Sequence, residues 1–340
     1  MPIARSLTIR KSGKTGALTS LGTIATGSNP YDICITPDGN HAYTANYGSN
    51  TLSIFSRNTT TGVLSGTSSI TAGSGTWPRG VCVSPDNNHV YASGYDGGRV
   101  VIFSRNTSTG ALTDLGNVSI GASTFPWGIC ISPNGANIYV ANNNNTVSTF
   151  TRNSSTGALT GGATSATGSQ SRQVCISPDG VSVYVTNYAS NTVSIFTRNT
   201  STGALSGSST IATGNQPVGI TVSPEGTHVY VANYGGTLSI FSRNTTTGAL
   251  TSISSPVAGV QPWDVCVSAD GKNVYVCLGS STASSVTAYT RNTSTGALTS
   301  LGSISPGIIS ASPRSICLSA DDLNVYAANF NAGTAVMYSR

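Results

Sequence analysis

The chain has 340 residues, of which only 8% are charged, and a formal net charge of +5. It contains no run of lysines and arginines, which argues against nucleic acid as a partner. No apolar segment approaches the roughly 20 residues that a membrane-spanning helix needs, and the first residues lack the apolar core of a secretory signal.

The first segment, residues 1–12, is expected to be a tail or an extra strand. Within it, Leu7-Thr8-Ile9 resembles a degenerate copy of a strand that recurs later in the chain. A tail packed on the surface and a strand that pairs with a neighbouring molecule are both open interpretations. The segment from Ala17 to Ala25 then predicts a complete strand that precedes the first full repeat.

A repeat of about 47 residues occupies the rest of the chain. The first copy opens with the segment Pro30-Tyr31-Asp32-Ile33-Cys34-Ile35, followed by the turn Thr36-Pro37-Asp38-Gly39. The seven copies begin at Pro30, Pro78, Pro126, Ser171, Pro217, Pro262 and Pro313. Because one repeat cannot bury its own apolar face, we expect residues 1–340 to form a single domain.

Each repeat divides into four strand-like pieces, here named A to D in chain order. The link between A and B resembles Pro-Asp-Gly, a sequence typical of the tight turn of a β-hairpin. The link between C and D ends in glycine in every copy. Short strands at regular spacing, punctuated by turns, predict an all-β, seven-bladed propeller with four-stranded antiparallel blades. The last repeat stops at piece C, residues 334–340, so the N-terminal outer strand should complete the C-terminal blade and close the ring.

Six cysteines occupy one position of piece A, and Thr221 takes that place in the fifth copy. They are Cys34, Cys82, Cys130, Cys175, Cys266 and Cys317. A metal or redox device is one interpretation, but zinc-ligand spacing is absent. We favour a small, soft side chain that packs at a crowded inner strand. The seventh, Cys277, falls in piece B.

Arginine ends piece C in every repeat, and an acidic residue occupies the A–B turn in six of them. The arginines are Arg57, Arg105, Arg152, Arg198, Arg243, Arg291 and Arg340. The acidic residues are Asp38, Asp86, Asp179, Glu225, Asp270 and Asp321, with Asn134 in the remaining turn. Strand direction places both sets on one face, so we expect repeated contacts between them, exposed and worth about 1 kcal/mol or less each. His41, His89 and His228 follow these turns and are expected to pack there rather than to act as general bases.

The two positions after the opening residue of piece A differ between repeats. Piece A should be innermost, so these positions open on the central channel at the face opposite the turns. The candidate binding residues are Tyr31, Asp32, Arg79, Trp127, Arg172, Gln173, Trp263, Asp264 and Arg314. The B–C loops add Tyr47, Tyr95, Asp96, Arg99, Tyr188, Tyr234 and Phe330. Arginine suits carboxylate or phosphate and tryptophan offers a stacking face, although these residues could also simply plug the channel.

The B pieces contain the motifs Tyr139-Val140-Ala141-Asn142 and Tyr184-Val185-Thr186-Asn187. With the SPDG turns and the TGAL pieces, residues 7–340 resemble the YVTN-type seven-bladed propellers and the related bacterial 6-phosphogluconolactonase-like lactonases. The resemblance implies lactone hydrolysis, in which arginines would be donors to the oxyanion and Asp32, Asp264 or Asp96 the base. No complete catalytic set of that family can be matched to this sequence.

Three functions follow as hypotheses. The first is a non-enzymatic recognition or scaffold propeller that binds a small anionic or carbohydrate ligand, or a protein partner, at the channel face. The second is a lactonase-type hydrolase, and the third is a surface protein that assembles through its N-terminal strand. No cofactor motif is visible, although backbone carbonyls with Asp32 or Asp264 could supply oxygen ligands to a metal in the channel. The compartment stays open, because free cysteines favour a reducing interior while the Ser/Thr/Asn-rich composition favours the outside.

Overall fold

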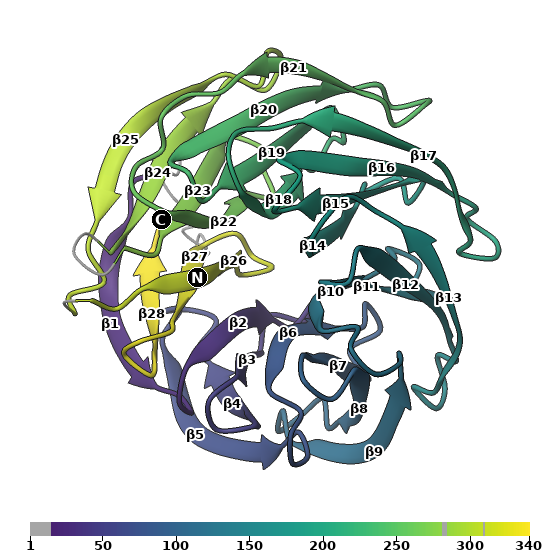
Figure 1. The fold of residues 1–340 in the computed structure, drawn as a ribbon. Coiled ribbons are helices and arrows are strands. Elements are labelled where there is room, and N and C mark those ends of the chain that lie inside the picture. The colour runs from purple at the N-terminus through teal and green to yellow at the C-terminus, as the bar shows by residue number, and fades with distance from the viewer. Residues whose placement is uncertain (1–14, 281–283, 309) are drawn as a thin grey trace, which may run out of the picture.

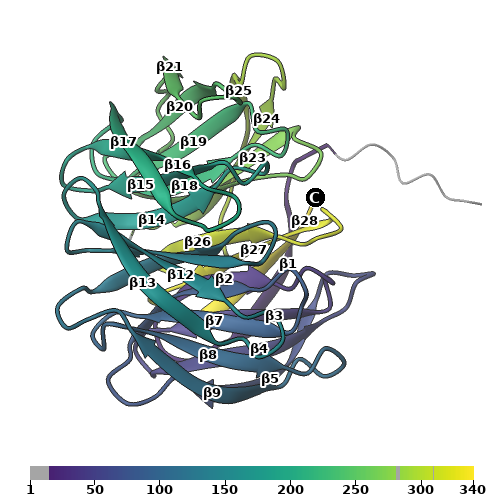
Figure 2. The ribbon, with the colours of Figure 1, turned by 90° about the vertical axis from the view of Figure 1, so that its right-hand side faces the viewer.

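The computed structural model describes residues 15–280, 284–308 and 310–340, and these form seven blades around a central channel (Figures 1 and 2). Every blade is a four-stranded antiparallel sheet whose strands follow one another outwards in chain order, except for the blade that joins the two ends. No helix occurs in the described part of the chain. The predicted seven-bladed all-β propeller is confirmed.

The strands of the four pieces recur with similar lengths. The inner strands are β2 (Pro30–Ile35), β6 (Pro78–Val83), β10 (Pro126–Ile131), β14 (Ser171–Ile176), β18 (Pro217–Val222), β22 (Pro262–Val267) and β26 (Pro313–Leu318). The second strands are β3 (His41–Asn46), β7 (His89–Gly94), β11 (Asn137–Asn142), β15 (Ser182–Asn187), β19 (His228–Asn233), β23 (Asn273–Leu278) and β27 (Asn324–Asn329). The third strands are β4 (Thr51–Arg57), β8 (Arg99–Arg105), β12 (Thr146–Arg152), β16 (Thr192–Arg198), β20 (Thr237–Arg243), β24 (Ser285–Arg291) and β28 (Thr334–Ser339). The outer strands are β1 (Thr19–Ala25), β5 (Leu64–Thr71), β9 (Leu112–Ser119), β13 (Leu159–Ala166), β17 (Leu205–Ala212), β21 (Leu250–Ser254) and β25 (Leu298–Ile304).

The ring closes as the sequence predicts. Strand β1 pairs antiparallel with β28, from Thr19 opposite Ser339 to Ala25 opposite Thr334. This pairing covers the outer edge of the C-terminal blade, which would otherwise be open to other chains. The segment 1–12, with its strand-like Leu7–Ile9, lies outside the described residues, so its role stays a prediction.

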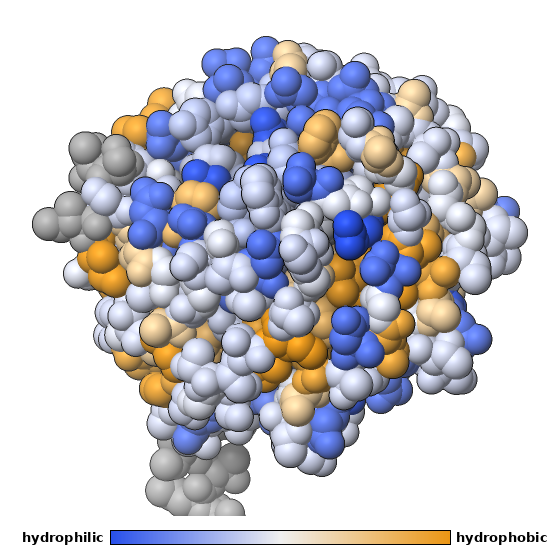
Figure 3. All heavy atoms as spheres, turned by 60° about the horizontal axis from the view of Figure 1, so that its bottom comes forward, coloured by the Kyte–Doolittle hydropathy of each residue, from blue (hydrophilic) through white to orange (hydrophobic). Residues whose placement is uncertain are grey.

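Apolar residues fill the seams between neighbouring blades. The seam of the first two blades contains Tyr43, Leu52, Val81 and Val90, each less than 5% exposed. Similar clusters occupy the other seams. On the outside, the view in Figure 3 is mostly polar, and hydrophobic residues gather only in scattered patches.

One tyrosine and one arginine link the blades at every seam. The second-strand tyrosine donates its hydroxyl to the glycine carbonyl of the neighbouring C–D loop, as Tyr43 does to Gly110 at 2.7 Å. It accepts a hydrogen bond from the neighbouring third-strand arginine, as from Arg105 Nε at 3.0 Å. Gly110 has a φ of +74°, and a Cβ there would lie 2.2 Å from the His41 ring. The invariant glycine of these loops therefore has two causes, a left-handed backbone and a close approach.

The predicted contacts between turn acids and arginines are present, but only the acids are partly exposed, and the arginines are buried. Arg57 binds Asp321, Arg105 binds Asp38, Arg152 binds Asp86 and Arg243 binds Asp179 at 2.7–2.8 Å, and Arg291 binds Glu225. These arginine side chains are at most 1% exposed, although the acids are 24–37% exposed. Each arginine crosses a seam into the preceding blade, so the expectation that both partners are exposed is wrong for the arginines. Arg198, which faces the turn with Asn134, binds Asn137 Oδ1 at 2.6 Å instead.

The three histidines lie in these same seams, and each is 4% exposed. His41, His89 and His228 each place Nδ1 within 2.8 Å of an arginine Nη2. Burial, together with the adjacent arginine, lowers their pKa values, so they are neutral at pH 7. The prediction of turn packing agrees with this placement.

The turn acids make the fold sensitive to acid. Burial opposes ionisation of Glu225, but hydrogen bonds from Arg291 and Thr227 outweigh it and lower its pKa from 4.5 to about 2. The pKa values of Asp38, Asp86, Asp179 and Asp321 are lowered by similar hydrogen bonds. A carboxyl whose pKa falls on folding stabilises the fold above its unfolded pKa and loses that contribution as the pH drops.

We therefore expect the thermal midpoint to fall steeply from about pH 4.5 to about pH 2, measured by circular dichroism. Glu225→Gln should make the midpoint less dependent on pH in this range. An unchanged midpoint across the range would contradict the role given to the turn acids.

Candidate functional site

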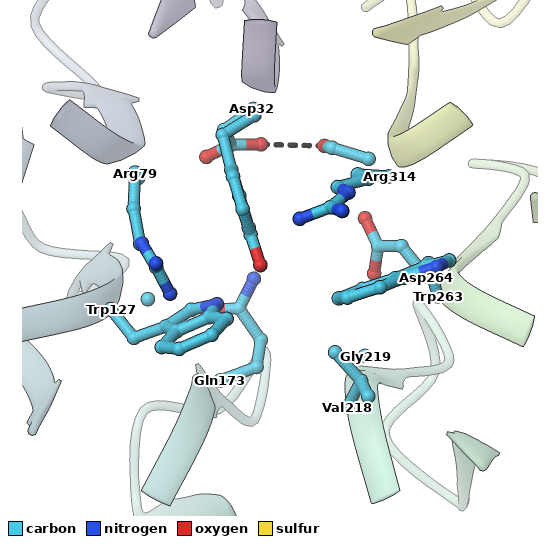
Figure 4. Close-up of a pocket in the computed structure, with 13 residues that line it drawn as sticks. Asp32, Arg79, Trp127, Gln173, Val218, Gly219, Trp263, Asp264 and Arg314 are labelled. Atoms are coloured by element: carbon cyan, nitrogen blue, oxygen red, sulfur yellow. Dashed lines mark hydrogen bonds between the residues drawn. The ribbon is translucent and has the colours of Figure 1, made fainter. Parts of the chain in front are cut away.

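The starts of the seven inner strands meet at one mouth of the channel, opposite the turns. Each inner strand changes register with its neighbour just after its first residue, as between Pro30 and Asp32. Such a bulge re-aims the side chains beside it. The variable positions therefore converge on one cavity, to which every blade contributes at least one residue (Figure 4).

Eight of the nine predicted binding residues line this cavity. They are Tyr31, Asp32, Arg79, Trp127, Gln173, Trp263, Asp264 and Arg314. In Figure 4, Arg79 and Trp127 lie on one side, and Arg314, Trp263 and Asp264 on the other. The ninth, Arg172, does not line the cavity and instead stacks on Trp127, with its Cζ 3.5 Å from the ring centroid. That these residues bind a ligand stays a prediction.

Tyr31 reaches across the channel at the mouth. Its ring is 5% exposed and reaches Trp127 at 5.5 Å and Trp263 at 6.2 Å between centroids, although these residues belong to the third and sixth blades. The remaining cavity has a volume of about 30 Å³, enough for a water molecule or two. A larger ligand therefore requires the Tyr31 ring to move aside.

The three mouth arginines are held by aromatic rings rather than by acids. Arg79 lies 3.6 Å from the Tyr95 centroid and 3.7 Å from that of Trp127. Arg314 lies 3.6 Å from Phe330 and 4.4 Å from Trp263. Cation–π contacts of this kind are strongest when the cation is desolvated. They leave the guanidinium edges available for other partners.

Several nitrogens of these arginines are buried without a hydrogen-bond acceptor. They are Arg79 Nε and Nη1, Arg172 Nε and Arg314 Nε. No acid forms a salt bridge with these arginines among the described residues. Burial lowers the pKa of Arg172 to about 10, and Arg79 contributes as a like charge. Arg172 nevertheless stays cationic at neutral pH, so the mouth has unbalanced positive charge.

Two carboxyl groups line the same cavity as Arg79 and Arg314. Asp32 accepts hydrogen bonds from Ile33 N, Val81 N and Ser315 Oγ at 2.8, 2.9 and 2.5 Å. Asp264 accepts hydrogen bonds from Val265 N at 2.9 Å and Ile316 N at 3.1 Å, and it also interacts with the Ser315 hydroxyl. Both carboxylates thus join their own blade to its neighbour.

The pKa values of these two carboxyl groups shift in the opposite direction from those of the turn acids. Burial in the channel raises the pKa of Asp32. Burial, with Asp32 as a nearby like charge, raises the pKa of Asp264 to about 7. A group with a pKa near 7 can accept and return a proton under neutral conditions.

A second, larger space of about 430 Å³ lies along the channel toward the turn face. Asp264 and Gln173 line both this space and the mouth cavity, and Cys266, Cys317 and Thr221 lie farther along it. All seven cysteines are free, and burial raises the pKa of each. In the described part of the chain, no three His, Cys, Asp or Glu side chains are arranged to hold a metal ion. The oxygens of Asp32 and Asp264 that were considered for a metal already accept the hydrogen bonds given above.

The B–C loops contribute aromatic side chains around the mouth. Tyr47, Tyr95, Tyr188, Tyr234 and Phe330 occupy one repeated position and contact the mouth arginines or tryptophans. Asp96 is exposed, and neither Asp96 nor Arg99 lines the cavity.

Gly279 takes the aromatic position in the sixth blade. A Cβ at Gly279 would lie 2.1 Å from Trp263. The absence of a side chain there therefore makes room for the tryptophan.

Two aromatic residues at this face were not predicted. Trp77 and Phe125 precede the inner strands of the second and third blades, and Trp77 is 39% exposed. Comparing the residue before the opening proline across the repeats would have revealed them, because the other blades have Asn, Gln or Ser there.

The sequence model described as "Lactonase, 7-bladed beta-propeller" matches residues 7–126, 120–218, 164–267 and 208–307. The chain belongs to this family of seven-bladed propeller lactonases. No curated protein matches the sequence.

Solved structures share the fold of this lactonase-family chain at low identity. A putative 6-phosphogluconolactonase from Bacteroides fragilis is 22% identical, with a TM-score of 0.72 over 82% of this chain and 85% of that one. A periplasmic gluconolactonase from Pseudomonas aeruginosa is 20% identical, with a TM-score of 0.71 over 83% and 86%. Hydrazine synthase from Kuenenia stuttgartiensis is 17% identical, with a TM-score of 0.72 over 95% and 98%. At these identities the likeness concerns the fold, which hosts more than one chemistry.

The described part of this lactonase-family chain has no helix of the length and hydrophobicity that crossing a membrane requires.

Proposed function

We propose that the chain hydrolyses a lactone that carries a negatively charged group, and that the reaction takes place at the channel mouth. One observation carries the proposal. In the seam arginines all three guanidinium nitrogens donate hydrogen bonds, and most pair with acids, whereas Arg79, Arg172 and Arg314 keep buried nitrogens without acceptors. An anion is the group that would satisfy such nitrogens.

Membership of the lactonase family favours hydrolysis over simple binding, which was the first hypothesis from the sequence. In the proposed reaction, a base removes a proton from water, and the resulting hydroxide bonds to the lactone carbonyl carbon. The carbonyl oxygen takes up the negative charge, which a guanidinium can stabilise. Collapse of this intermediate breaks the bond to the ring oxygen, which receives the proton and becomes the hydroxyl of a hydroxy acid.

Asp264 is the residue that best fits the base. It lines the mouth cavity together with Arg79 and Arg314 and has a pKa near 7. Asp32 already accepts three hydrogen bonds, and exposed Asp96 lies outside the cavity. Since the cavity holds little more than water, Tyr31 would move outward when the substrate enters.

The test measures hydrolysis of 6-phosphoglucono-δ-lactone and glucono-δ-lactone in a pH-stat. Arg79→Ala and Arg314→Ala should each raise KM for the phosphorylated lactone about 10- to 100-fold, because each removes charge-assisted hydrogen bonds. Arg172→Ala should have a smaller effect, because Arg172 stands behind Trp127. Lys272→Ala is the matched control, since it removes one exposed positive charge near the opposite face.

Hydrolysis at the uncatalysed rate by the parent protein would refute the proposal. A thermal-shift screen with sugar acids and sugar phosphates then decides what remains. If the parent does not hydrolyse either lactone, an anion that stabilises the parent but not Arg314→Ala would identify the protein as a non-enzymatic binding module.

A further inference from the structure

The residue before each inner strand has a left-handed backbone in all seven blades. The φ angles are +53° at Asn29, +47° at Trp77, +49° at Phe125, +58° at Gln170, +58° at Gln216, +54° at Gln261 and +51° at Ser312. Six of these residues also precede proline, which ordinarily pushes its neighbour toward an extended conformation. The conformation is therefore imposed by the fold.

Hydrogen bonds on both sides fix this backbone. The carbonyl of Trp77 accepts from Tyr95 N at 3.2 Å, and that of Phe125 accepts from Asn143 N at 3.1 Å, as in the other blades. Trp77 N donates to Asn50 Oδ1 of the preceding blade at 2.6 Å. These bonds belong to the main chain and do not require an aromatic side chain at either position.

Trp77 and Phe125 are unfavourable choices for such a position. Asparagine tolerates positive φ, whereas a bulky side chain with positive φ is an outlier. Five blades have Asn, Gln or Ser at this position, so the backbone conformation forms with polar residues and does not require an aromatic one. The strain at Trp77 and Phe125 indicates that their rings serve another purpose, since strained residues of this kind gather at functional sites.

Their rings extend the mouth outward over the first three blades. Trp77 contacts Tyr47 at 5.3 Å between centroids, Tyr47 contacts Tyr95 at 6.5 Å, and Tyr95 contacts Phe125 at 5.2 Å. We call Tyr47, Trp77, Tyr95 and Phe125 the aromatic rim. Tyr95 lies 5.6 Å from Trp127, so the aromatic rim continues into the mouth cavity.

We propose that the aromatic rim is a subsite for a neutral sugar ring, so that the ligand of the mouth carries a glycosyl substituent. The C–H face of a pyranose is apolar and packs on the electron-rich face of an aromatic ring. The exposed indole of Trp77 offers such a surface. The inference rests on the proposed function only for the identity of the group inside the mouth.

Neutral hydrogen-bonding groups beside the aromatic rim favour sugar over an aromatic ligand. Asn143, next to Phe125 through the main chain, has a buried Oδ1 without a partner. Asn144, which follows it, is exposed. The Asn144 oxygen already accepts from Thr146 Oγ1 at 2.7 Å, so the free acceptor here is the Asn143 oxygen. A sugar hydroxyl can donate to it, whereas a plain aromatic ring would leave it unpaired.

The test is titration of the full chain with maltotriose, cellotriose and triacetylchitotriose, followed by calorimetry. We expect at least one trisaccharide to bind saturably. Trp77→Asn with Phe125→Gln should weaken that binding tenfold or more. These two substitutions introduce residue types found at the same position in other blades, so the thermal midpoint should equal or exceed that of the parent. Gln170→Asn with Gln216→Asn is the matched control and should leave the affinity unchanged.

Each other outcome is informative. If the parent binds none of the three trisaccharides, or if the double variant binds as tightly as the parent, the sugar subsite is refuted. Phenyl compounds that bind the parent and not the double variant, without any trisaccharide binding, would assign the rim to an aromatic group instead. Trisaccharide binding without lactone hydrolysis would refute the proposed function and support the sugar subsite. Lactone hydrolysis without trisaccharide binding would support the proposed function and refute the sugar subsite.

Discussion

Arg57→Met should lower the free energy of unfolding by about 3–5 kcal/mol, the usual cost of leaving buried partners of a charge unpaired. The Arg57 side chain is fully buried at the seam between the last and first blades. It donates to Tyr326 Oη at 2.7 Å, Gly39 O at 3.0 Å, Asn324 Oδ1 at 2.7 Å and both oxygens of Asp321. Methionine fills a similar volume but donates to none of them. Chemical denaturation followed by tryptophan fluorescence would measure the loss.

Asp321→Asn separates the ion pair from the rest of this network. One seam of the protein already lacks a turn carboxylate, because Asn134 stands where the others have Asp or Glu, and Arg198 there binds Asn137. We therefore expect Asp321→Asn to cost about 1 kcal/mol or less, as for a partly exposed pair. If both variants were equally destabilised, the charge of Asp321 and not the hydrogen-bond network would hold the seam.

Asp264→Asn should reduce kcat for lactone hydrolysis by about 10²- to 10⁴-fold, the usual contribution of a general base. The amide keeps one acceptor for a backbone N–H but cannot take a proton from water. Asp96→Asn is the matched control, because Asp96 is exposed and outside the cavity, and its kcat should equal that of the parent. Equal thermal midpoints of Asp264→Asn and the parent would exclude a folding defect as the cause.

The same assignment predicts the pH dependence. Only the ionised carboxylate can act as the base, and burial raises the pKa of Asp264 to about 7. The rate should therefore rise with pH and level off above about pH 8, with an apparent pKa near 7. A rate that is flat from about pH 5 to pH 9, together with an active Asp264→Asn variant, would place the base elsewhere.

The fold could be predicted from the sequence because every blade repeats its own turn chemistry. The Pro-Asp-Gly turns and the loop glycines fix local geometry, and the spare segment at residues 17–25 fixes the closure. The burial of the seam arginines could not be predicted in the same way. A repeat shows that Arg105 and Asp38 share a face, but it does not show that Arg105 reaches across a seam to Tyr43.

The candidate site was predicted in position but not in shape. Strand order places the variable residues at the mouth, and eight of the nine do line one cavity. Arg172 differs because it stacks behind Trp127, and Tyr31 crosses the channel, which depends on side-chain direction. The special nature of Trp77 and Phe125 depends on φ angles, which the sequence reveals only through comparison with the polar residues of the other blades.

The pairing of β1 with β28 also has a consequence during synthesis. Strand β1 ends at Ala25 and its partner begins at Thr334, so β1 leaves the ribosome long before β28. At typical elongation rates of about 5–20 residues per second, the delay is on the order of 15–60 seconds. Throughout that time a Ser/Thr/Gly-rich strand waits without its partner beside six other blades of nearly the same sequence. A more apolar strand would promote pairing with the wrong blade or with a second nascent chain. The polar character of β1 is thus an advantage during synthesis.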